Sequence, residues 1–184
     1  MNGVDHKTAL DPMLLEDRDK PFIGLCWQGN PSNRNDVHRS LTLEELIPHL
    51  PSEATFFNLQ ISLTEQQEKR LAAHQIVNFS EGLSTLTGTA AICARLDGVI
   101  AVDTSLCHLA GSLGIPTFLL LSLASDWRWG KSTDRTVWYN NTKLFKQTSR
   151  GEWSAPLKTL KETLERDIIS PFYTGADADR FLGK

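Results

Sequence analysis

The chain has no excess of basic residues, no paired-cysteine motif and no long hydrophobic run. Its 184 residues carry 19 Lys and Arg against 22 Asp and Glu, a formal net charge of -3, which argues against a general nucleic-acid-binding protein. The three cysteines, none in a Cys-x-x-Cys pair, indicate buried free thiols in a reducing compartment. The most apolar stretch, 115–124, is too short to span a bilayer. We therefore expect a cytoplasmic protein without a membrane span and without a nucleic-acid partner.

Several motifs of familiar site chemistry are also missing. There is no G-x-x-x-x-G-K-[ST] loop, and Gly111 and Gly114 lie at the end of an expected helix rather than at its start, so neither a P-loop nor a dinucleotide site is indicated. The five histidines show no metal-ligand spacing, and the Asp177-x-Asp179 pair is predicted to be a solvated turn. No G-x-S-x-G elbow occurs. Kinase and dehydrogenase functions are disfavoured, and no bound metal is expected.

Short runs of Val, Ile, Phe and Leu alternate with helix-period segments from residue 21 onward. This alternation predicts an α/β fold, a single doubly wound Rossmann-like domain with a mainly parallel sheet of about six strands and helices on both faces. The expected strands are 22–27, 54–59, 76–79, 98–102, 117–121 and 143–145. The expected helices are 43–50, 65–73, 84–96, 104–113 and 155–168, of which the Ala-rich 84–96 is expected to be buried.

Local signals support these boundaries. Thr42 with Glu45, and Thr64 with Gln67, form capping-box pairs at the starts of two helices. Gly114 is expected to end a helix in the left-handed conformation. The pattern predicts an N-terminal extension or linker at 1–20, the domain at 21–170 and a tail at 171–184.

The segment Asp103–His108 is the strongest local signal for a ligand site, because ligands of open α/β sheets bind at the carboxyl ends of the strands. Free backbone N–H groups, the hydroxyls of Thr104 and Ser105 and the helix dipole all favour a phosphate there. His108 follows Thr104 by four residues and shares its helical face. The alternative is that Asp103 or Thr104 only caps the helix and His108 is a satisfied core residue.

Two further loops follow expected strands. The loop Gly29–Ser40 is rich in donors, with Arg34, His38 and Arg39 among Asn30, Asn33 and Asn35, and it is suited to meet a diphosphate from the other side. A solvated basic loop is the alternative. In Ser125–Trp129, two tryptophans flank Arg128 and either stack on a base or sugar or pack the loop onto the domain.

The ordered succession of these motifs resembles the carboxyl-terminal, donor-binding half of GT-B glycosyltransferases, heptosyltransferase-like and similar to TPR-linked O-GlcNAc transferases. The resemblance covers about Phe22 to Leu164, and the sequence departs from it at Gly88, where relatives usually carry an acidic residue. Its landmarks are Gly24–Pro31, Asn35-Asp36 with Arg39-Ser40, Phe57–Gln60, Thr89–Ile92, Leu96-Asp97, Val99–Thr104, His108–Gly111, Gly114–Pro116, Asp126–Trp129, Trp138-Tyr139 and Leu144–Gln147.

The resemblance implies metal-independent transfer of a hexosyl or heptosyl group from a nucleotide-diphospho-sugar, without a cofactor and with the UDP-, ADP- or GDP-linked donor left open. His108 and Arg39 would stabilise the leaving group. The implied donor-binding residues are Gln28, Gly29, Asn30, Ser40, Gln60, Asp103, Thr104, Ser105, Asp126, Trp127 and Arg128.

The resemblance also implies that the acceptor site and the general base lie on an amino-terminal half that the residues before Phe22 are too few to form. A separate Rossmann-like half or a TPR-containing chain is therefore an expected partner, and the chain alone is expected to be incomplete for catalysis. The alternative is a non-catalytic nucleotide-binding or protein-interaction module derived from such a transferase. A sugar-nucleotide epimerase half is a weaker alternative.

Overall fold

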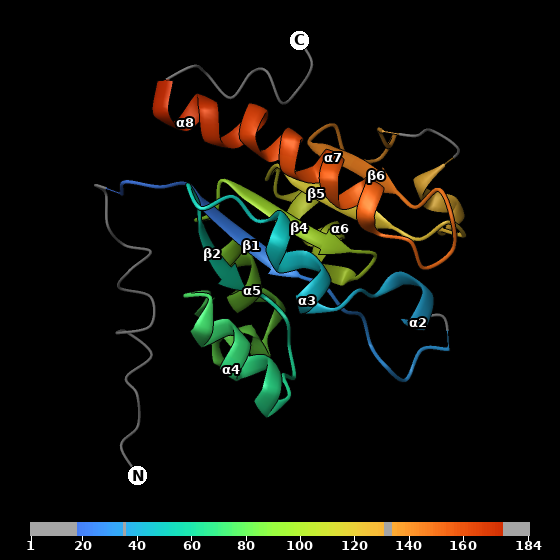
Figure 1. Ribbon diagram of the computed structural model, residues 1–184, viewed down its shortest axis with the longest axis horizontal. Helices are drawn as coiled ribbons and strands as arrows, with labels where there is room; N and C mark the ends of the chain where they lie inside the picture. The colour runs from blue at the N-terminus through green and yellow to red at the C-terminus, as the bar shows by residue number, and fades with distance from the viewer. Residues whose placement is uncertain (1–17, 35, 131–133, 175–184) are drawn as a thin grey trace.

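The computed structural model describes residues 18–34, 36–130 and 134–174, and in it a six-stranded, wholly parallel sheet forms the centre of the molecule (Figure 1). The strand order is β3-β2-β1-β4-β5-β6, the order of a doubly wound Rossmann fold. The expectations for Asn35 and for Asp177 and Asp179 lie outside the described residues. The predicted fold class is confirmed.

The strands are β1 (Phe22–Cys26), β2 (Thr55–Asn58), β3 (Val77–Asn78), β4 (Gly98–Val102), β5 (Thr117–Leu121) and β6 (Thr142–Lys146).

Alternation along the strands divides the core into two layers. In β1, Ile23 and Leu25 pack into one layer, and Phe22 and Cys26 pack into the other, because successive side chains of a strand point to opposite faces. Every residue of β1, β4 and β5 is buried. Strands covered on both faces need such uninterrupted apolar runs, which is why the sequence identified them.

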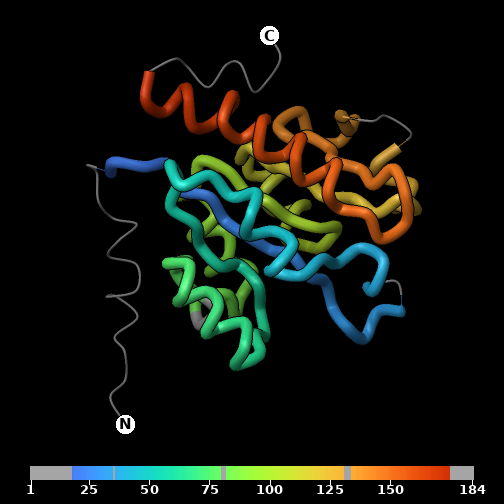
Figure 2. Tube along the Cα trace, viewed as in Figure 1, coloured from blue at the N-terminus to red at the C-terminus, as the bar shows by residue number. Residues whose placement is uncertain are grey.

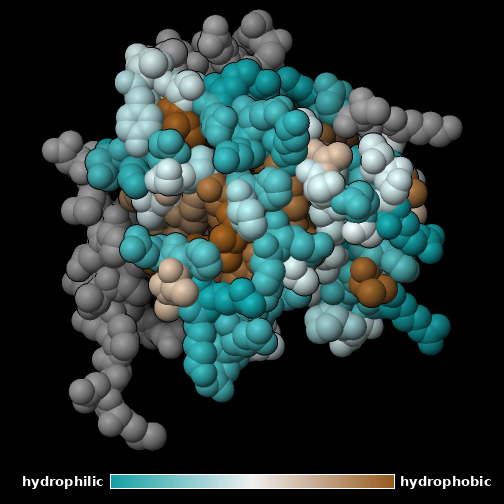
Figure 3. Space-filling view, viewed as in Figure 1, coloured by the Kyte–Doolittle hydropathy of each residue, from teal (hydrophilic) through white to brown (hydrophobic). Residues whose placement is uncertain are grey.

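Helices cover both faces of the sheet (Figure 1). One layer receives side chains from α3 (Leu43–Leu46), α4 (Glu65–Ala73) and α7 (Ser154–Leu164), and the other from α5 (Leu86–Cys93) and α6 (Ser105–Ser112). The two predicted capping boxes begin α3 and α4, and Gly114 has φ +77° after α6. The short helices η2 (Ile47–His49) and η3 (Ser80–Ser84) complete the first half. Figure 3 shows hydrophobic side chains in the middle of the α3 and α7 face, surrounded by hydrophilic ones.

The prediction of a buried helix at 84–96 was wrong. The helix α5 is shorter, only its Ile92 and Cys93 are buried, and Leu86 is 69% exposed. Alanine has the highest helix propensity whether or not it is covered. The Ala-rich composition therefore indicated a helix and carried little information about its burial.

The last helix continues past its expected end at residue 168. A π-helical turn, η5 (Glu165–Ile169), joins α7 to α8 (Ser170–Thr174), and the tube in Figure 2 runs on through this joint. In the widened turn the N–H and the hydroxyl of Ser170 both donate to the carbonyl of Glu165, five residues back. Pro171, which has no N–H to donate, is the second residue of α8 and follows this wider turn directly. None of the helices in the described ranges is long and apolar enough to cross a bilayer.

Candidate functional site

A cleft of about 470 Å³ opens at the carboxyl ends of the strands. It extends from the loops after β1 and β4 to those after β5 and β6. The chain winds in opposite directions from the neighbouring strands β1 and β4, and this switch point is where doubly wound folds bind ligands. Three arginines, one histidine and two carboxylates line the cleft. The lining residues are Asn33, His38, Arg39, Asp103, Leu121, Ser122, Leu123, Ala124, Ser125, Asp126, Arg128, Gln147 and Arg150.

Arg39 is held in place by two hydrogen bonds. Within the loop predicted at 29–40 the structure forms a short helix, α2 (Asp36–Arg39), in which Arg39 Nε donates to Asp36 Oδ1 at 2.9 Å. Arg39 Nη1 donates to the main-chain oxygen of Asp103 at 2.8 Å. The guanidinium is thus fixed at the cleft with further N–H groups available to a ligand.

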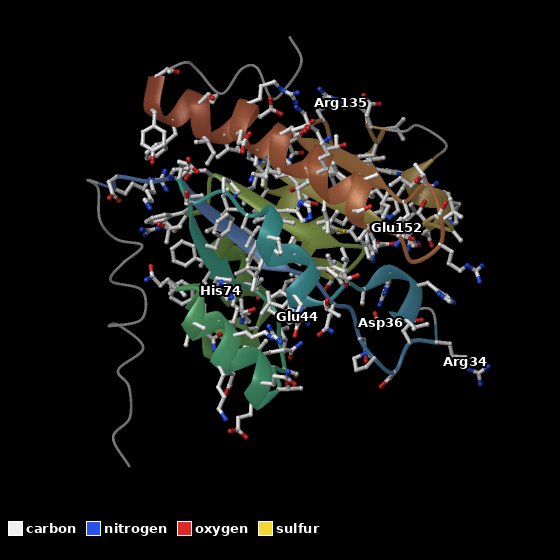
Figure 4. The ribbon with its side chains drawn as sticks, in the orientation of Figure 1. Arg34, Asp36, Glu44, His74, Arg135 and Glu152 are labelled. Carbon is white, nitrogen blue, oxygen red and sulfur yellow. The ribbon has the colours of Figure 1, made fainter. Side chains whose placement is uncertain are left out.

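Gly29 and Ser40 shape the backbone under Arg39. A Cβ on Gly29 would collide with the Asp36 carboxylate and the Arg39 guanidinium, so a larger residue there would displace this ion pair. The Gly29 N–H donates to Ser40 Oγ at 2.9 Å. In Figure 4, Arg34 of the same loop points away from the molecule, and it is exposed.

The start of α6 is uncapped by side chains. Thr104 occupies the N-cap position with φ -137° and ψ 173°, yet its side chain makes no capping hydrogen bond. The first N–H groups of α6 therefore have no side-chain acceptor at the N-cap. The Thr104 hydroxyl lies 3.9 Å from Cys26 Sγ instead. The alternative in which the Thr104 side chain caps the helix is therefore wrong.

His108 packs against two aromatic residues. Its ring stacks on Trp129 with centroids 5.0 Å apart, and its Nδ1 lies 3.1 Å from the Tyr139 hydroxyl. His108 does not line the cleft. These contacts orient the ring and engage Nδ1, and a donor role of Nε2 toward an anion stays a prediction.

Three side chains of the segment Asp103–His108 could together hold a metal ion. Ligand atoms of Asp103, Cys107 and His108 all lie within 4.8 Å of one another, the one such group of three in the described residues. Burial raises the pKa of the Cys107 thiol to about 12, and Sγ donates to the Thr104 carbonyl at 2.9 Å. Without a metal the thiol is therefore protonated at neutral pH.

The other two cysteines are also buried and free, as predicted. Burial raises the pKa of both Cys26 and Cys93 to about 11. None of the three thiols is therefore activated as a nucleophile.

Three further residues predicted to bind the donor are engaged within the protein. Gln60 is buried, and its Oε1 accepts from the Gln28 N–H at 3.0 Å while its Nε2 donates to the Ile61 carbonyl. The Gln28 side chain accepts from Gln67 at 2.9 Å, and Asn30 Oδ1 accepts from the Ser32 N–H. These contacts hold the loop after β1, and ligand contacts of these residues stay predictions.

The two tryptophans of the loop after β5 have different positions. Trp129 is buried under His108, so it packs the loop onto the domain, whereas Trp127 is 77% exposed. Both belong to η4 (Trp127–Trp129), which is capped by Asp126. Asp126 also pairs with Arg128 at 3.3 Å, and both of these charged residues line the cleft.

Four of the predicted site residues line the cleft: Arg39, Asp103, Asp126 and Arg128. The sequence did not predict that Gln147 and Arg150 belong to the site. Both follow β6. The rule that ligands meet the carboxyl ends of strands, applied to the strand expected at 143–145, would have found them.

Comparison with known proteins bears on the fold. No protein-family model matches the sequence. Protein FlbA of Caulobacter vibrioides is 30% identical over 158 residues, which is 82% of this chain and 26% of FlbA. The chain therefore spans about a quarter of that relative's length.

Solved structures of glycosyltransferases have a similar fold. E. coli ADP-heptose lps heptosyltransferase II superposes with a TM-score of 0.54 at 16% identity, covering 88% of this chain and 50% of the enzyme. E. coli heptosyltransferase WaaC with ADP gives 0.53 at 18% identity, covering 88% and 48%. A family 9 glycosyl transferase from Veillonella parvula gives 0.54 at 13%, covering 96% and 50%. The fold of this chain is thus similar to about half of each glycosyltransferase chain.

Proposed function

We propose that the chain is the nucleotide-sugar-binding domain of a metal-independent glycosyltransferase, with the donor's diphosphate on the N-terminus of α6. The observation that carries the proposal is the start of α6, where Thr104 leaves the first helical N–H groups without a side-chain cap. Helix N-termini bind phosphate through such groups and through the helix dipole. The fold similarity to heptosyltransferases supports the same assignment.

Arg39 supplies the second half of the proposed phosphate site. Its bond to the Asp103 carbonyl places the guanidinium next to the residue that precedes Thr104. Departure of a nucleoside diphosphate requires stabilisation of developing negative charge, and preorganised donors provide it without reorganisation. Arg39 and the α6 N–H groups would perform this role, and His108 would donate from its second nitrogen.

A proline substitution tests the backbone contribution directly. Ser105 is the first residue of α6, a position where proline is compatible with a helix and removes one free N–H. The residue before it, Thr104, already has the extended backbone that a following proline requires. Ser105→Pro should therefore preserve the fold and weaken nucleotide-diphosphate binding, while Ser105→Ala, which keeps the N–H, should affect it less.

Calorimetry with UDP, ADP and GDP measures this effect. We expect at least one of the three to bind the parent chain at millimolar concentration and to bind Ser105→Pro about tenfold more weakly, the loss of one hydrogen bond to a charged group. If none of the three binds the folded parent chain at millimolar concentration, the proposed function is wrong.

We further propose that transfer requires another domain over the cleft, which would carry the acceptor site and the general base. Three large apolar side chains beside cleft-lining Arg128 are exposed: Trp127 by 77%, Val137 by 91% and Trp138 by 57%, with Trp138 Nε1 donating to the Arg128 carbonyl. Exposed patches of this kind mark interaction surfaces. We expect the chain alone to bind nucleotide but not to release nucleotide from a bound UDP- or ADP-sugar. Turnover of such a sugar nucleotide by the chain alone would contradict this proposal.

A further inference from the structure

The end of the cleft that follows β5 and β6 contains donors without an acceptor among the described residues. Gln147 is 2% exposed, and its Nε2 has no hydrogen-bond partner among the described residues. The hydroxyl of Ser125 is also buried without a partner there. Both residues line the cleft. Buried polar groups without partners cost free energy, so two of them in one cleft wall call for a ligand or water.

The orientation of the Gln147 amide is set by the backbone. Its Oε1 accepts from the Leu123 N–H at 3.2 Å and from the Gly151 N–H at 3.3 Å. A flipped amide would place its NH₂ group against these two donors, so the network assigns the oxygen to them and the nitrogen to the other side. Gln147 therefore offers only donors to a ligand.

Arg150 adds charge at the same end. It lines the cleft, is exposed, and forms no salt bridge within the described residues. The carboxylate of Glu152 accepts from the Ser154 N–H at the start of α7, and that of Asp126 pairs with Arg128. The guanidinium therefore has no anionic partner among the residues that the structure describes.

We propose that this end of the cleft is an oxyanion subsite, in which Gln147 Nε2, Ser125 Oγ and the Arg150 guanidinium bind a carboxylate or a phosphate group. An amide, a hydroxyl and a guanidinium together offer neutral and charged donors to several oxygens of one group, the pattern that favours an oxyanion. Among the described residues no Phe, Tyr or Trp lines the cleft, and its one aromatic ring is the imidazole of His38. This subsite goes beyond the proposed diphosphate site on α6 and does not depend on it.

Nuclear magnetic resonance of the ¹⁵N-labelled chain tests the subsite with simple probes. Inorganic phosphate and malonate are titrated separately at constant ionic strength, and the Gln147 side-chain NH₂ and Arg150 Nε–H signals are followed. We expect saturable shifts of both signals with at least one probe at millimolar concentration, and the tighter probe identifies the group as phosphate or carboxylate. The NH₂ signal of Gln66, an exposed glutamine on α4, should not move.

Two variants separate recognition from a structural role. Gln147→Glu keeps the oxygen that accepts from Leu123 and Gly151 but replaces the donor nitrogen by an acceptor, so it should weaken probe binding at least tenfold. Arg150→Gln, at an exposed position where folding is not at risk, should weaken it several-fold. Arg34→Gln, at the exposed loop position, should leave binding unchanged.

The outcomes distinguish this subsite from the nucleotide site. If Ser105→Pro loses nucleotide binding but keeps the Gln147 shifts, the two sites are separate as proposed. If no nucleotide binds and the Gln147 and Arg150 shifts still saturate, the proposed function fails while the subsite stands. Probe shifts confined to residues 104–106, or no saturable shift with either probe because Gln147 holds only an ordered water, would overturn the subsite.

Discussion

Arg39 Nη1 donates to the main-chain oxygen of Asp103 at 2.8 Å and so joins the loop after β1 to the start of α6. These two segments are far apart in the sequence and come from the two central strands of the sheet. The bond fixes the position of a cleft arginine that contacts both of them. Its removal should therefore affect ligand binding more than folding.

Arg39→Ala should weaken binding of the nucleotide diphosphate by about tenfold or more, since a hydrogen bond to a charged group is worth roughly 1.5–3 kcal/mol. Calorimetry gives the affinity, and urea titration shows that the chain stays folded. Arg34→Ala is the matched control, because Arg34 lies in the same loop and points away from the molecule (Figure 4). Equal losses in both variants would mean that only the net charge of the loop matters.

Tyr139→Phe should lower the free energy of unfolding by about 1 kcal/mol, because it removes the hydroxyl that contacts His108 Nδ1 and keeps the ring. His108→Ala should cost more, since it also removes the stack on Trp129. Urea unfolding followed by tryptophan fluorescence measures both. If His108→Ala weakens nucleotide binding and Tyr139→Phe does not, the histidine contributes to the site itself; unchanged binding in both variants would limit His108 to packing.

Asp167 makes stability depend on acid pH. Burial alone would raise the pKa of its carboxyl, but hydrogen bonds and charges from Arg166 and Lys143 outweigh burial and lower the pKa below its ordinary value. Lys143 Nζ lies 2.5 Å from the carboxylate, whose side chain is only 6% exposed. A lowered pKa contributes stability above the unfolded-state pKa, and that contribution is lost as pH falls through the folded-state value.

Asp167→Asn should therefore cost about 2 kcal/mol of unfolding free energy at neutral pH, where the paired carboxylate is ionised. The difference from the parent chain should shrink toward zero as the pH falls below about 3.9, the ordinary pKa of aspartate. Urea titrations across this range measure it. A cost that does not change with pH would show that the side chain stabilises by packing alone.

The three cysteines should resist alkylation in the folded chain. Burial raises the pKa of Cys26 and Cys93 to about 11 and that of Cys107 to about 12, so the reactive thiolate is scarce at neutral pH. Mass spectrometry after iodoacetamide treatment should find no label in buffer and three labels in urea. Rapid labelling of one cysteine without denaturant would mean that its surroundings open locally.

Nucleotide binding should not require a metal ion. The Asp103, Cys107 and His108 cluster includes a protonated thiol that donates to the Thr104 carbonyl, and the cations of the proposed site are arginines. Calorimetry before and after EDTA treatment should give the same affinity. If EDTA weakens nucleotide binding and zinc restores it in the parent chain, and if EDTA has no effect on Cys107→Ala, the cluster is instead a metal site.

Short-range signals predicted most of the fold. The strands at 98–102 and 117–121 and the helix at 65–73 match the structure residue for residue. Each has a strong local cause: a continuous apolar run buried on both faces, or a capping box at Thr64. The burial of 84–96 and the helix end at 168 were predicted wrongly, because they depend on what packs outside a helix and on the π-turn that joins α7 to α8.

The sequence by itself determined the doubly wound sheet and placed Arg39, Asp103, Asp126 and Arg128 at the ends of its strands, because periodicity and strand ends are local properties. Only the tertiary structure decided which of two nearby tryptophans is buried, that Thr104 leaves α6 uncapped, and that the Gln147 oxygen is held by Leu123 and Gly151. These features depend on contacts between segments that are distant along the chain, or on which rotamer a side chain adopts once it is packed. They arise when the sheet brings loops after β1, β4, β5 and β6 to one edge.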